Sequence, residues 1–250
     1  MSDHRRFFVD PHLLTTKQIS IEGAVARQVN RVLRLKTDDH ITLLDGLGNS
    51  YDARIILSTP QLLNAQIVDK RIGDGEPVLE LVLASCVPKS DRIELIVQKC
   101  TELGISEMML IRSERTVVRL DESGGLKKAE RLGKIAAEAA EQCGRSMIPR
   151  LRGVIDFDDL TRRVADFDLA IIAWEEEDKS SSLRDVLRTN VGAKSVLLIV
   201  GPEGGLTSSE VELAKSAGAV SVSFGSRVLR TDTAAIAGCA AIMYELEGQL

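Results

Sequence analysis

Two short apolar runs constrain the fold of this chain more strongly than any other feature. Residues 168–173 read DLAIIA and residues 195–200 read SVLLIV, with no alternation of polar and apolar side chains. Continuous runs of this kind are typical of central strands in a parallel sheet that is covered on both faces. Segments with helical patterns alternate with the strand-like ones, at about 91–103, 126–143, 182–189, 207–218 and 231–246. This alternation predicts an α/β domain with a largely parallel sheet.

The N-terminal part of the chain has a different pattern. Segments 40–45, 50–57 and 63–69 read as short strands separated by turns, which is typical of a small β-barrel or meander, and one helix is expected at about 22–33. The turn-rich stretch from Gly73 to Pro77 separates the two patterns. We therefore predict a smaller N-terminal β domain of residues 1–74 and a C-terminal α/β domain of residues 75–250.

Composition and charge favour a cytoplasmic protein without a metal site. No apolar run approaches the ~20 residues of a membrane-spanning helix, and the charged first eight residues are not followed by the apolar stretch of a secretion signal. The four cysteines are widely spaced and include no Cys-x-x-Cys pair, which favours buried thiols. The net charge is −5, divided into +1 for residues 1–75 and −6 for the remainder, so RNA binding would depend on local basic patches.

The loop Gly201-Pro-Glu-Gly-Gly205 is the first candidate ligand site. It follows the strand that ends at Val200 and precedes a helix whose Thr207 and Glu210 have the spacing of a capping box. Its glycines allow a ligand to approach the backbone closely, and ligands of open α/β sheets bind outside the carboxyl ends of strands. The loop matches neither Gly-x-Gly-x-x-Gly nor a P-loop. A ligand-binding loop is favoured over a simple tight turn.

The segment Phe224–Ala234 is the second candidate, because it also connects a strand (about 220–223) to a helix. It carries Arg227 and Arg230, which we expect beside the first loop, and Thr231 suits the start of the helix. All three histidines precede residue 41, so proton transfer in the α/β domain must use carboxylates, Lys, Arg, Tyr or solvent. The small residues of the helix after Ala234 fit either the core or a dimer interface.

Arginines elsewhere in the chain are candidates for contact with RNA phosphates. Arg27, Arg31 and Arg34 recur at helical spacing, whereas the lysines at the start of the 126–143 helix fit an exposed helix face. Arg145, Arg150 and Arg152 follow the end of that helix. The residues for which we expect phosphate contact are Arg5, Arg6, Arg31, Arg34, Arg115 and Arg145.

The chain also carries motifs that extend over nearly its whole length. They include RFF at 6–8, VLR at 32–34, KCTELG at 99–104, SER at 113–115, GPEGG at 201–205 and RVLRT at 227–231. With these motifs the chain resembles the RsmE family of SPOUT (α/β-knot) methyltransferases, which methylate N3 of a uridine in 16S ribosomal RNA. The last two motifs are the most specific. Some positions depart from the family pattern, namely Arg27-Gln28, Phe224 and Asp232.

The resemblance implies an N-terminal PUA-like β-barrel that binds RNA and a knotted C-terminal domain that binds S-adenosylmethionine. It also implies a homodimer and a 16S rRNA substrate in the small ribosomal subunit. The implied cofactor-binding residues are Gly201, Pro202, Glu203, Gly204, Gly205, Phe224, Gly225, Val228 and Leu229. For catalysis we nominate Arg230, which would stabilise negative charge on the uracil carbonyl oxygens, and Glu203 as a base or as the residue that positions the cofactor.

Other functions remain as alternatives. A ribose 2′-O-methyltransferase or a transfer-RNA base methyltransferase would share the fold, but the RFF start and the added β domain disfavour it. A non-catalytic ribosome-assembly factor would have little need of the intact glycines in the 201–205 loop. A nucleotide- or phosphate-binding enzyme would depend on that glycine loop alone.

Overall fold

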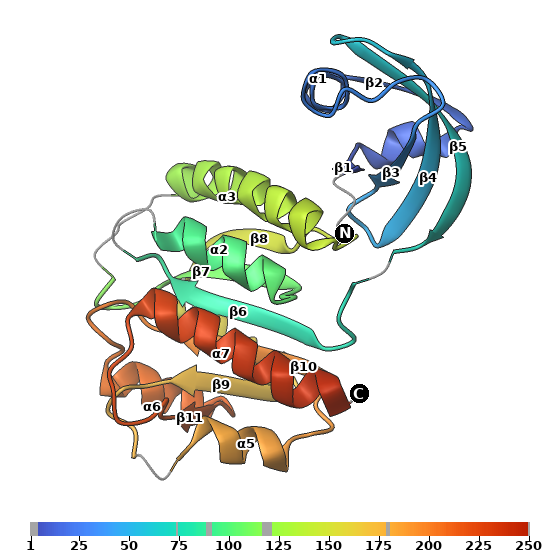
Figure 1. Cartoon of the computed structure of the whole chain (residues 1–250). Helices are drawn as coiled ribbons and strands as arrows, with labels where there is room; N and C mark the ends of the chain where they lie inside the picture. The colour runs from blue at the N-terminus through green and yellow to red at the C-terminus, as the bar shows by residue number, and fades with distance from the viewer. Residues whose placement is uncertain (1–4, 74, 89–91, 117–121, 179–180, 250) are drawn as a thin grey trace. The chain divides into compact units, whose positions relative to one another are not determined.

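The computed structural model describes residues 5–73, 75–88, 92–116, 122–178 and 181–249, and the chain divides into two compact units (Figure 1). Unit 1 comprises Met1–Glu76 together with Ala137–Ile148, and unit 2 comprises Pro77–Ala136 together with Pro149–Leu250. The segment 137–148 contains the end of the long helix α3 and the loop that follows it. The C-terminal part of one helix therefore belongs to the first unit, although the sequence pattern placed the whole helix in the second.

Unit 1 is built on a five-stranded sheet in which β1 pairs with β3 in parallel and the other neighbours are antiparallel. Its strand order is β1 (Arg6–Phe8), β3 (His40–Leu44), β4 (Asn49–Ser58), β5 (Leu62–Ile72) and β2 (Gln18–Glu22). The side chains of Phe7, Leu43 and Leu63 are fully buried in its core. Burial of each such side chain stabilises the fold by about 1.5–3 kcal/mol.

The helix expected at 22–33 is shorter and irregular. It consists of α1 (Ala24–Arg27) and a π-helical turn, η2 (Gln28–Val32). Arg34 lies beyond its end with a φ of 54°, in the left-handed region. The prediction that Arg34 shares a helix face with Arg27 and Arg31 is therefore wrong, because the backbone turns out of the helix before residue 34. A short 3₁₀ helix, η1, spans Pro11–Thr15.

Unit 2 contains a six-stranded sheet in which all neighbouring strands are parallel. Its order is β11 (Val220–Val222), β9 (Leu169–Ala173), β10 (Ser195–Val200), β6 (Glu80–Cys86), β7 (Glu107–Arg112) and β8 (Arg150–Asp156). The apolar runs at 168–173 and 195–200 thus contain β9 and β10, which are neighbours inside the sheet. The predicted α/β class with a parallel sheet is confirmed.

Helices cover both faces of this sheet (Figure 1). On one face α2 (Arg92–Glu102) packs against α7 (Thr231–Leu246), and α5 (Leu183–Thr189) contacts α7. The other face carries α4 (Phe157–Thr161) and α6 (Ser208–Ser216). The remaining helical segments are α3 (Glu122–Cys143), η3 (Val164–Asp166) and η4 (Glu247–Gln249).

Several local signals in the sequence fix the ends of these helices as expected. Gly104 and Gly144 follow α2 and α3 with φ of 98° and 88°, a conformation that favours glycine at a helix C-terminus. At the start of α6 the Glu210 amide donates to Thr207 Oγ1 (3.3 Å) and the Thr207 amide donates to Glu210 Oε2 (2.8 Å). This is the predicted capping box. Within the described residues, none of the helices has the length and apolarity to cross a membrane.

Candidate active site

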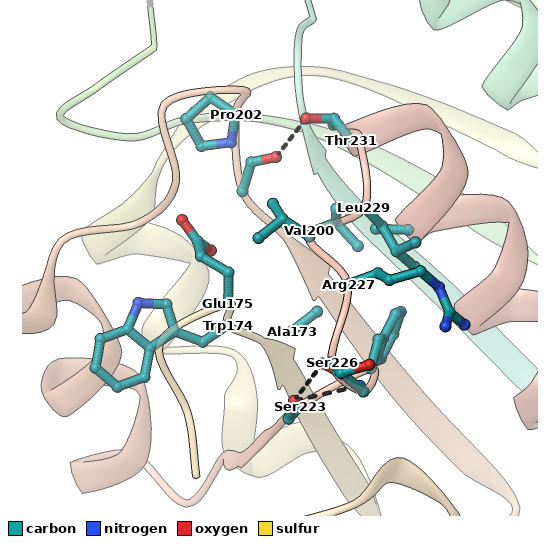
Figure 2. Close-up of a pocket in the computed structure, with 15 residues that line it drawn as sticks. Ala173, Trp174, Glu175, Val200, Pro202, Ser223, Ser226, Arg227, Leu229 and Thr231 are labelled. Carbon is teal, nitrogen blue, oxygen red and sulfur yellow. Dashed lines mark hydrogen bonds between the residues drawn. The ribbon is translucent and has the colours of Figure 1, made fainter. Parts of the chain in front are cut away.

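A pocket opens in unit 2 at the carboxyl ends of three adjacent strands, β9, β10 and β11 (Figure 2). This is the edge at which open α/β sheets bind ligands. The loop after each strand contributes to the lining, and the first turn of α7 closes one side. The lining residues are Ala173, Trp174, Glu175, Val200, Gly201, Pro202, Ser223, Phe224, Gly225, Ser226, Arg227, Val228, Leu229, Thr231 and Ala234.

Hydrogen bonds hold the loops of the pocket in place. Thr231 Oγ1 donates to the carbonyl oxygen of Gly201 (3.1 Å), which ties the start of α7 to the loop after β10. The Gly225 amide donates to Ser223 Oγ (3.3 Å), and this fixes the turn after β11. Gly225 has a φ of 105°, a backbone conformation that residues with a side chain rarely adopt. The pocket is thus a set of braced loops around an apolar floor that includes Val200 and Ala234.

Besides hydroxyl groups, the pocket lining includes two charged side chains and a tryptophan. Glu175 and Arg227 are the carboxylate and the guanidinium among the lining residues, and they lie on opposite sides of the pocket in Figure 2. The indole Nε1 of Trp174 is buried and has no hydrogen-bond partner within the described part of the chain. Buried donors in folded proteins are nearly always paired. The indole ring packs against the hydrophobic core of unit 2 and points away from the space between Glu175 and Arg227 (Figure 2).

The structure brings together six of the nine predicted cofactor-binding residues in the pocket lining. These are Gly201, Pro202, Phe224, Gly225, Val228 and Leu229. Glu203, Gly204 and Gly205 do not line it, because they form a turn that the Gly205 amide closes by donating to the Pro202 carbonyl oxygen (2.9 Å). Arg115 Nη1 donates to the carbonyl oxygen of Gly204 (3.0 Å) on the outside of this turn.

The two nominated catalytic residues lie next to the pocket rather than in its lining. Arg230 is the N-cap residue of α7, is exposed, and stands between Leu229 and Thr231, which both line the pocket. Glu203 is exposed in the turn after β10. Beside Arg230, Asp232 forms an ion pair with Arg92 of α2 (Nη1–Oδ1 3.6 Å).

Sequence reasoning missed the residues that follow β9. Trp174 and Glu175 were not among the predicted site residues, yet both line the pocket. The rule that selected the loop after β10 applies equally to β9, since parallel neighbours end at the same edge. Applied there, it would have found them. Ser223 and Ser226 were also missed, and Arg227 was noted without a role.

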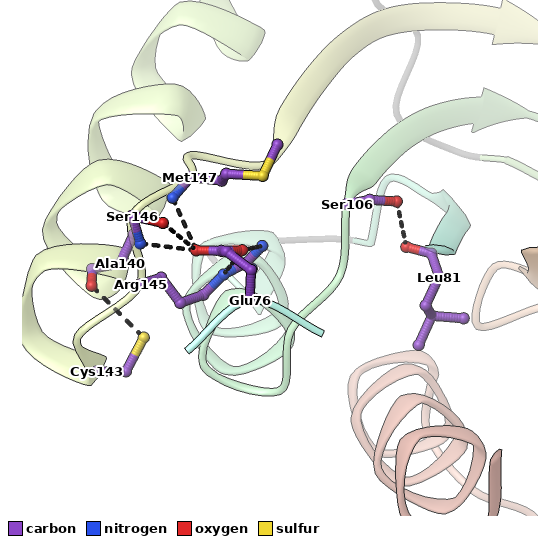
Figure 3. A network of polar contacts seen from close by, with 8 residues as sticks. All are labelled: Glu76, Leu81, Ser106, Ala140, Cys143, Arg145, Ser146 and Met147. Atoms are coloured by element: carbon purple, nitrogen blue, oxygen red, sulfur yellow. Dashed lines mark hydrogen bonds and ion pairs between the residues drawn. The ribbon is translucent and has the colours of Figure 1, made fainter. Parts of the chain in front are cut away.

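Arg145 has an internal partner, Glu76, within unit 1 (Figure 3). Its Nη2 and Nε donate to Glu76 Oε2 at 2.9 and 3.1 Å, and the residue is only 4% exposed. Glu76 Oε1 also accepts from the amides of Ser146 (2.7 Å) and Met147 (2.8 Å). A guanidinium used in this way has little surface left for phosphate. This geometry argues against the RNA contact expected for Arg145.

The other arginines nominated for RNA contact differ in exposure. Arg31, Arg34 and Arg115 are exposed, whereas Arg5 and Arg6 are partly exposed. Arg6 also donates to the carbonyl oxygen of Gly144. The described residues contain no group of three or more His, Cys, Asp or Glu that could hold a metal ion.

Comparison with known proteins shows the class of enzyme to which this chain belongs. A family model described as an RNA methyltransferase domain matches residues 75–243, which include the whole six-stranded sheet and the pocket. A ribosomal RNA small subunit methyltransferase E from Bacillus subtilis (strain 168) is 33% identical over 252 residues, which cover 97% of this chain and 97% of the relative. The chain therefore belongs to the family of ribosomal RNA small subunit methyltransferase E, as its motifs predicted.

Two solved structures are similar over nearly the whole chain. A ribosomal RNA small subunit methyltransferase E from Neisseria gonorrhoeae, bound to S-adenosyl methionine, is 29% identical with a TM-score of 0.84 and covers 96% of this chain and 97% of its own. A methyltransferase from Legionella pneumophila in complex with the cofactor is 30% identical with a TM-score of 0.85, at the same coverage.

Proposed function

We propose that this protein transfers a methyl group from S-adenosylmethionine to N3 of a uridine in the 16S rRNA of the small ribosomal subunit. The observation that carries the proposal is the pocket at the carboxyl edge of the parallel sheet, formed by the loops that contain GPEGG and RVLRT. A relative that is similar over 97% of both chains is a small-subunit rRNA methyltransferase, and a similar solved structure binds S-adenosyl methionine.

The pocket residues fit this cofactor chemically. Val200, Leu229 and Ala234 offer an apolar surface for a purine ring, and Ser223 and Ser226 offer hydroxyl groups. The Glu175 carboxylate can accept hydrogen bonds from ribose hydroxyls or face the positive charge of the methionine group. Once bound, the cofactor supplies an activated methyl group. The braced loops hold their geometry before the ligand arrives, which reduces the entropic cost of binding.

The chemistry of the substrate assigns work to the residues beside the pocket. N3 of uracil carries a proton, and when this proton leaves, negative charge spreads to the two carbonyl oxygens. A guanidinium beside those oxygens stabilises the transition state more than the ground state. We assign this role to Arg230, and we assign to Glu203 the role of base or of positioning the cofactor. Both residues are exposed and reachable by a nucleotide.

The wider organisation proposed from the family pattern has three parts. The N-terminal domain, which we predicted to span residues 1–74, would be a PUA-like barrel that binds RNA. The C-terminal domain, residues 75–250, would contain the knot. The chain would form a homodimer in the cytoplasm. Support for the dimer comes from apolar side chains on and near α7 that are largely exposed, with Tyr244 at 86% and Val228 at 80%. Val228 precedes α7 and Tyr244 lies in its last turn, so apolar side chains are exposed at both ends of this helix.

The test is to incubate the protein with methyl-labelled S-adenosylmethionine and small ribosomal subunits that lack the modification, then digest the RNA and identify the labelled nucleoside. Label in 3-methyluridine is expected. Label in a 2′-O-methyl nucleoside would contradict the assigned specificity. Absence of label and of cofactor binding would favour the assembly-factor alternative.

A further inference from the structure

One buried carboxylate in unit 2 is surrounded by three arginines. Glu107, the first residue of β7, is 2% exposed. Its Oε1 lies 2.5 Å from Arg152 Nε and 3.7 Å from Arg163 Nη1, and its Oε2 lies 3.3 Å from Arg150 Nε. We refer to Arg150, Arg152 and Arg163 as the arginine cluster.

The pairing of β7 with β8 brings two of these arginines next to Glu107. In the parallel pair of β7 and β8, Glu107 is opposite Arg150 and Met109 is opposite Arg152. Residues two apart on a strand point to the same face, so both arginines of β8 extend on the face of Glu107. Arg163 reaches the same carboxylate from the end of α4. Because β8 is an edge strand, the cluster lies at the border of the sheet.

The cluster carries more positive charge than its carboxylates neutralise. Among the described residues, the carboxylates within 4 Å of it are Glu107 and, beside Arg150, Glu80 (Nη2–Oε1 3.9 Å). The side chains of Arg150, Arg152 and Arg163 nevertheless remain 67%, 49% and 33% exposed. Arg150 and Arg152 contact Glu107 through Nε, so these contacts do not occupy the terminal nitrogens of either guanidinium group. Three guanidinium groups thus face two carboxylates, which leaves the cluster with a net positive charge.

We propose that the arginine cluster binds phosphates of the RNA substrate. In this proposal Glu107 orients the guanidinium groups of the three arginines for contact with phosphate. Guanidinium groups match phosphate oxygens in geometry and charge. The proposal rests on the proposed function, since it presumes an RNA substrate. The cluster lies at the amino ends of β7 and β8, the sheet edge opposite the pocket, so the RNA footprint would extend well beyond the target nucleotide.

Chain connectivity agrees with this assignment. Arg150 is the second residue after the segment 137–148 of unit 1, the unit to which we assign RNA binding. The cluster therefore begins where the chain leaves that unit. Neither Arg150 nor Arg152 lines the pocket, and their loss should leave cofactor binding intact.

The experiment compares R150Q/R152Q with a control, R112Q/R131Q, which removes two other exposed arginines of unit 2 that each pair with one carboxylate. RNA affinity is measured with unmethylated small-subunit RNA over a range of salt concentrations, without cofactor. For R150Q/R152Q we expect the Kd to rise about tenfold and the slope of log K against log salt to fall by about two. In the methylation assay KM for RNA should rise with little change in kcat.

Two further variants separate binding from folding. R150K/R152K keeps the charge and should retain most of the salt slope, whereas E107Q keeps the shape but releases the arginines and should weaken RNA binding. Circular dichroism and thermal unfolding verify that each variant is folded. An RNA Kd and salt slope of R150Q/R152Q equal to those of the control would overturn the proposal. If the wild type binds RNA through the cluster but yields no 3-methyluridine, the proposed reaction fails while the surface stands.

Discussion

The carboxylate of Glu175 lies directly over the α-carbon of Gly205. A Cβ atom at position 205 would overlap Glu175 Oε1, and Gly205 has a φ of 72°. The last glycine of GPEGG therefore does not line the pocket itself but makes room for a side chain that does. This contact connects the loop after β9 to the turn after β10.

Replacing Gly205 with alanine should displace Glu175 and strain the turn. We expect Gly205→Ala to weaken S-adenosylmethionine binding by about tenfold, which corresponds to ~1.4 kcal/mol. Trp174 is the single tryptophan of the chain and lines the pocket, so its fluorescence reports binding directly. Gly192→Ala is the control, because a Cβ there meets no atom within 4 Å. Equal cofactor affinity in both variants would show that the position of Glu175 does not matter.

The proposed role of Arg230 predicts a separation of turnover from cofactor binding. Removal of a group that stabilises developing charge typically lowers kcat by about 10²–10³-fold. We therefore expect Arg230→Ala to lower kcat by about 100-fold while the cofactor Kd changes little. Arg227→Ala, in contrast, alters a residue that lines the pocket and should raise the cofactor Kd. Steady-state kinetics and a fluorescence titration measure both quantities, and parallel losses in Arg230→Ala would refute the assignment.

Most of the fold was predictable because it depends on local patterns. β9 and β10 are uninterrupted apolar runs, and α6 begins with a capping box that four residues encode. The strand β8 and the helix α4 were not foreseen. The strand Arg150–Asp156 lies at the edge of the sheet, and charged residues occupy alternate positions at its start. Its sequence therefore lacks the continuous apolar run of the central strands.

The site was predictable only where a motif marked it. GPEGG and RVLRT identified two of the three loops, and the third, after β9, carries no glycine. Long-range partners were invisible to local reasoning. Arg145 pairs with Glu76, 69 residues earlier in the chain, and this contact buries the guanidinium that we had expected at the RNA surface. The sequence alone does not distinguish an arginine that binds phosphate from one that forms an ion pair within the protein, as Arg145 does with Glu76.

Asp168 links the starts of β9 and β10 and makes stability depend on pH. Its Oδ2 accepts from the amides of Lys194 (2.9 Å) and Ser195 (3.0 Å), and these hydrogen bonds lower the pKa of the carboxyl. A lowered folded-state pKa contributes stability above the unfolded pKa of about 3.9 and loses it as pH falls through the folded value. Asp168→Ala should therefore be less stable than wild type at pH 7, with the difference shrinking below pH ~4. Denaturant unfolding at pH 7 and below pH ~4 measures the free energy of unfolding of both proteins. A difference in this free energy that is the same at both pH values would contradict the prediction.

Gly238 in α7 fits between a core side chain and a pocket side chain. A Cβ at this position would lie 2.7 Å from Leu198 Cδ2 and 3.0 Å from the Phe224 ring. Alanine favours a helix over glycine by about 1 kcal/mol, but overpacking a core costs about 1–3 kcal/mol. Leu198 is fully buried in a central strand and has little room to move. The packing cost should therefore exceed the gain in helix propensity.

We expect Gly238→Ala to lower the free energy of unfolding by about 1 kcal/mol and to weaken cofactor binding, because Phe224 lines the pocket and must shift. Gly133→Ala in α3 is the matched control: a Cβ there meets nothing within 4 Å, and the gain in helix propensity should appear alone. Adding Phe224→Leu to Gly238→Ala removes the ring and should restore part of both losses. If the single variant is as stable as the Gly133→Ala control and binds cofactor normally, the contact between Gly238 and Phe224 does not shape the pocket.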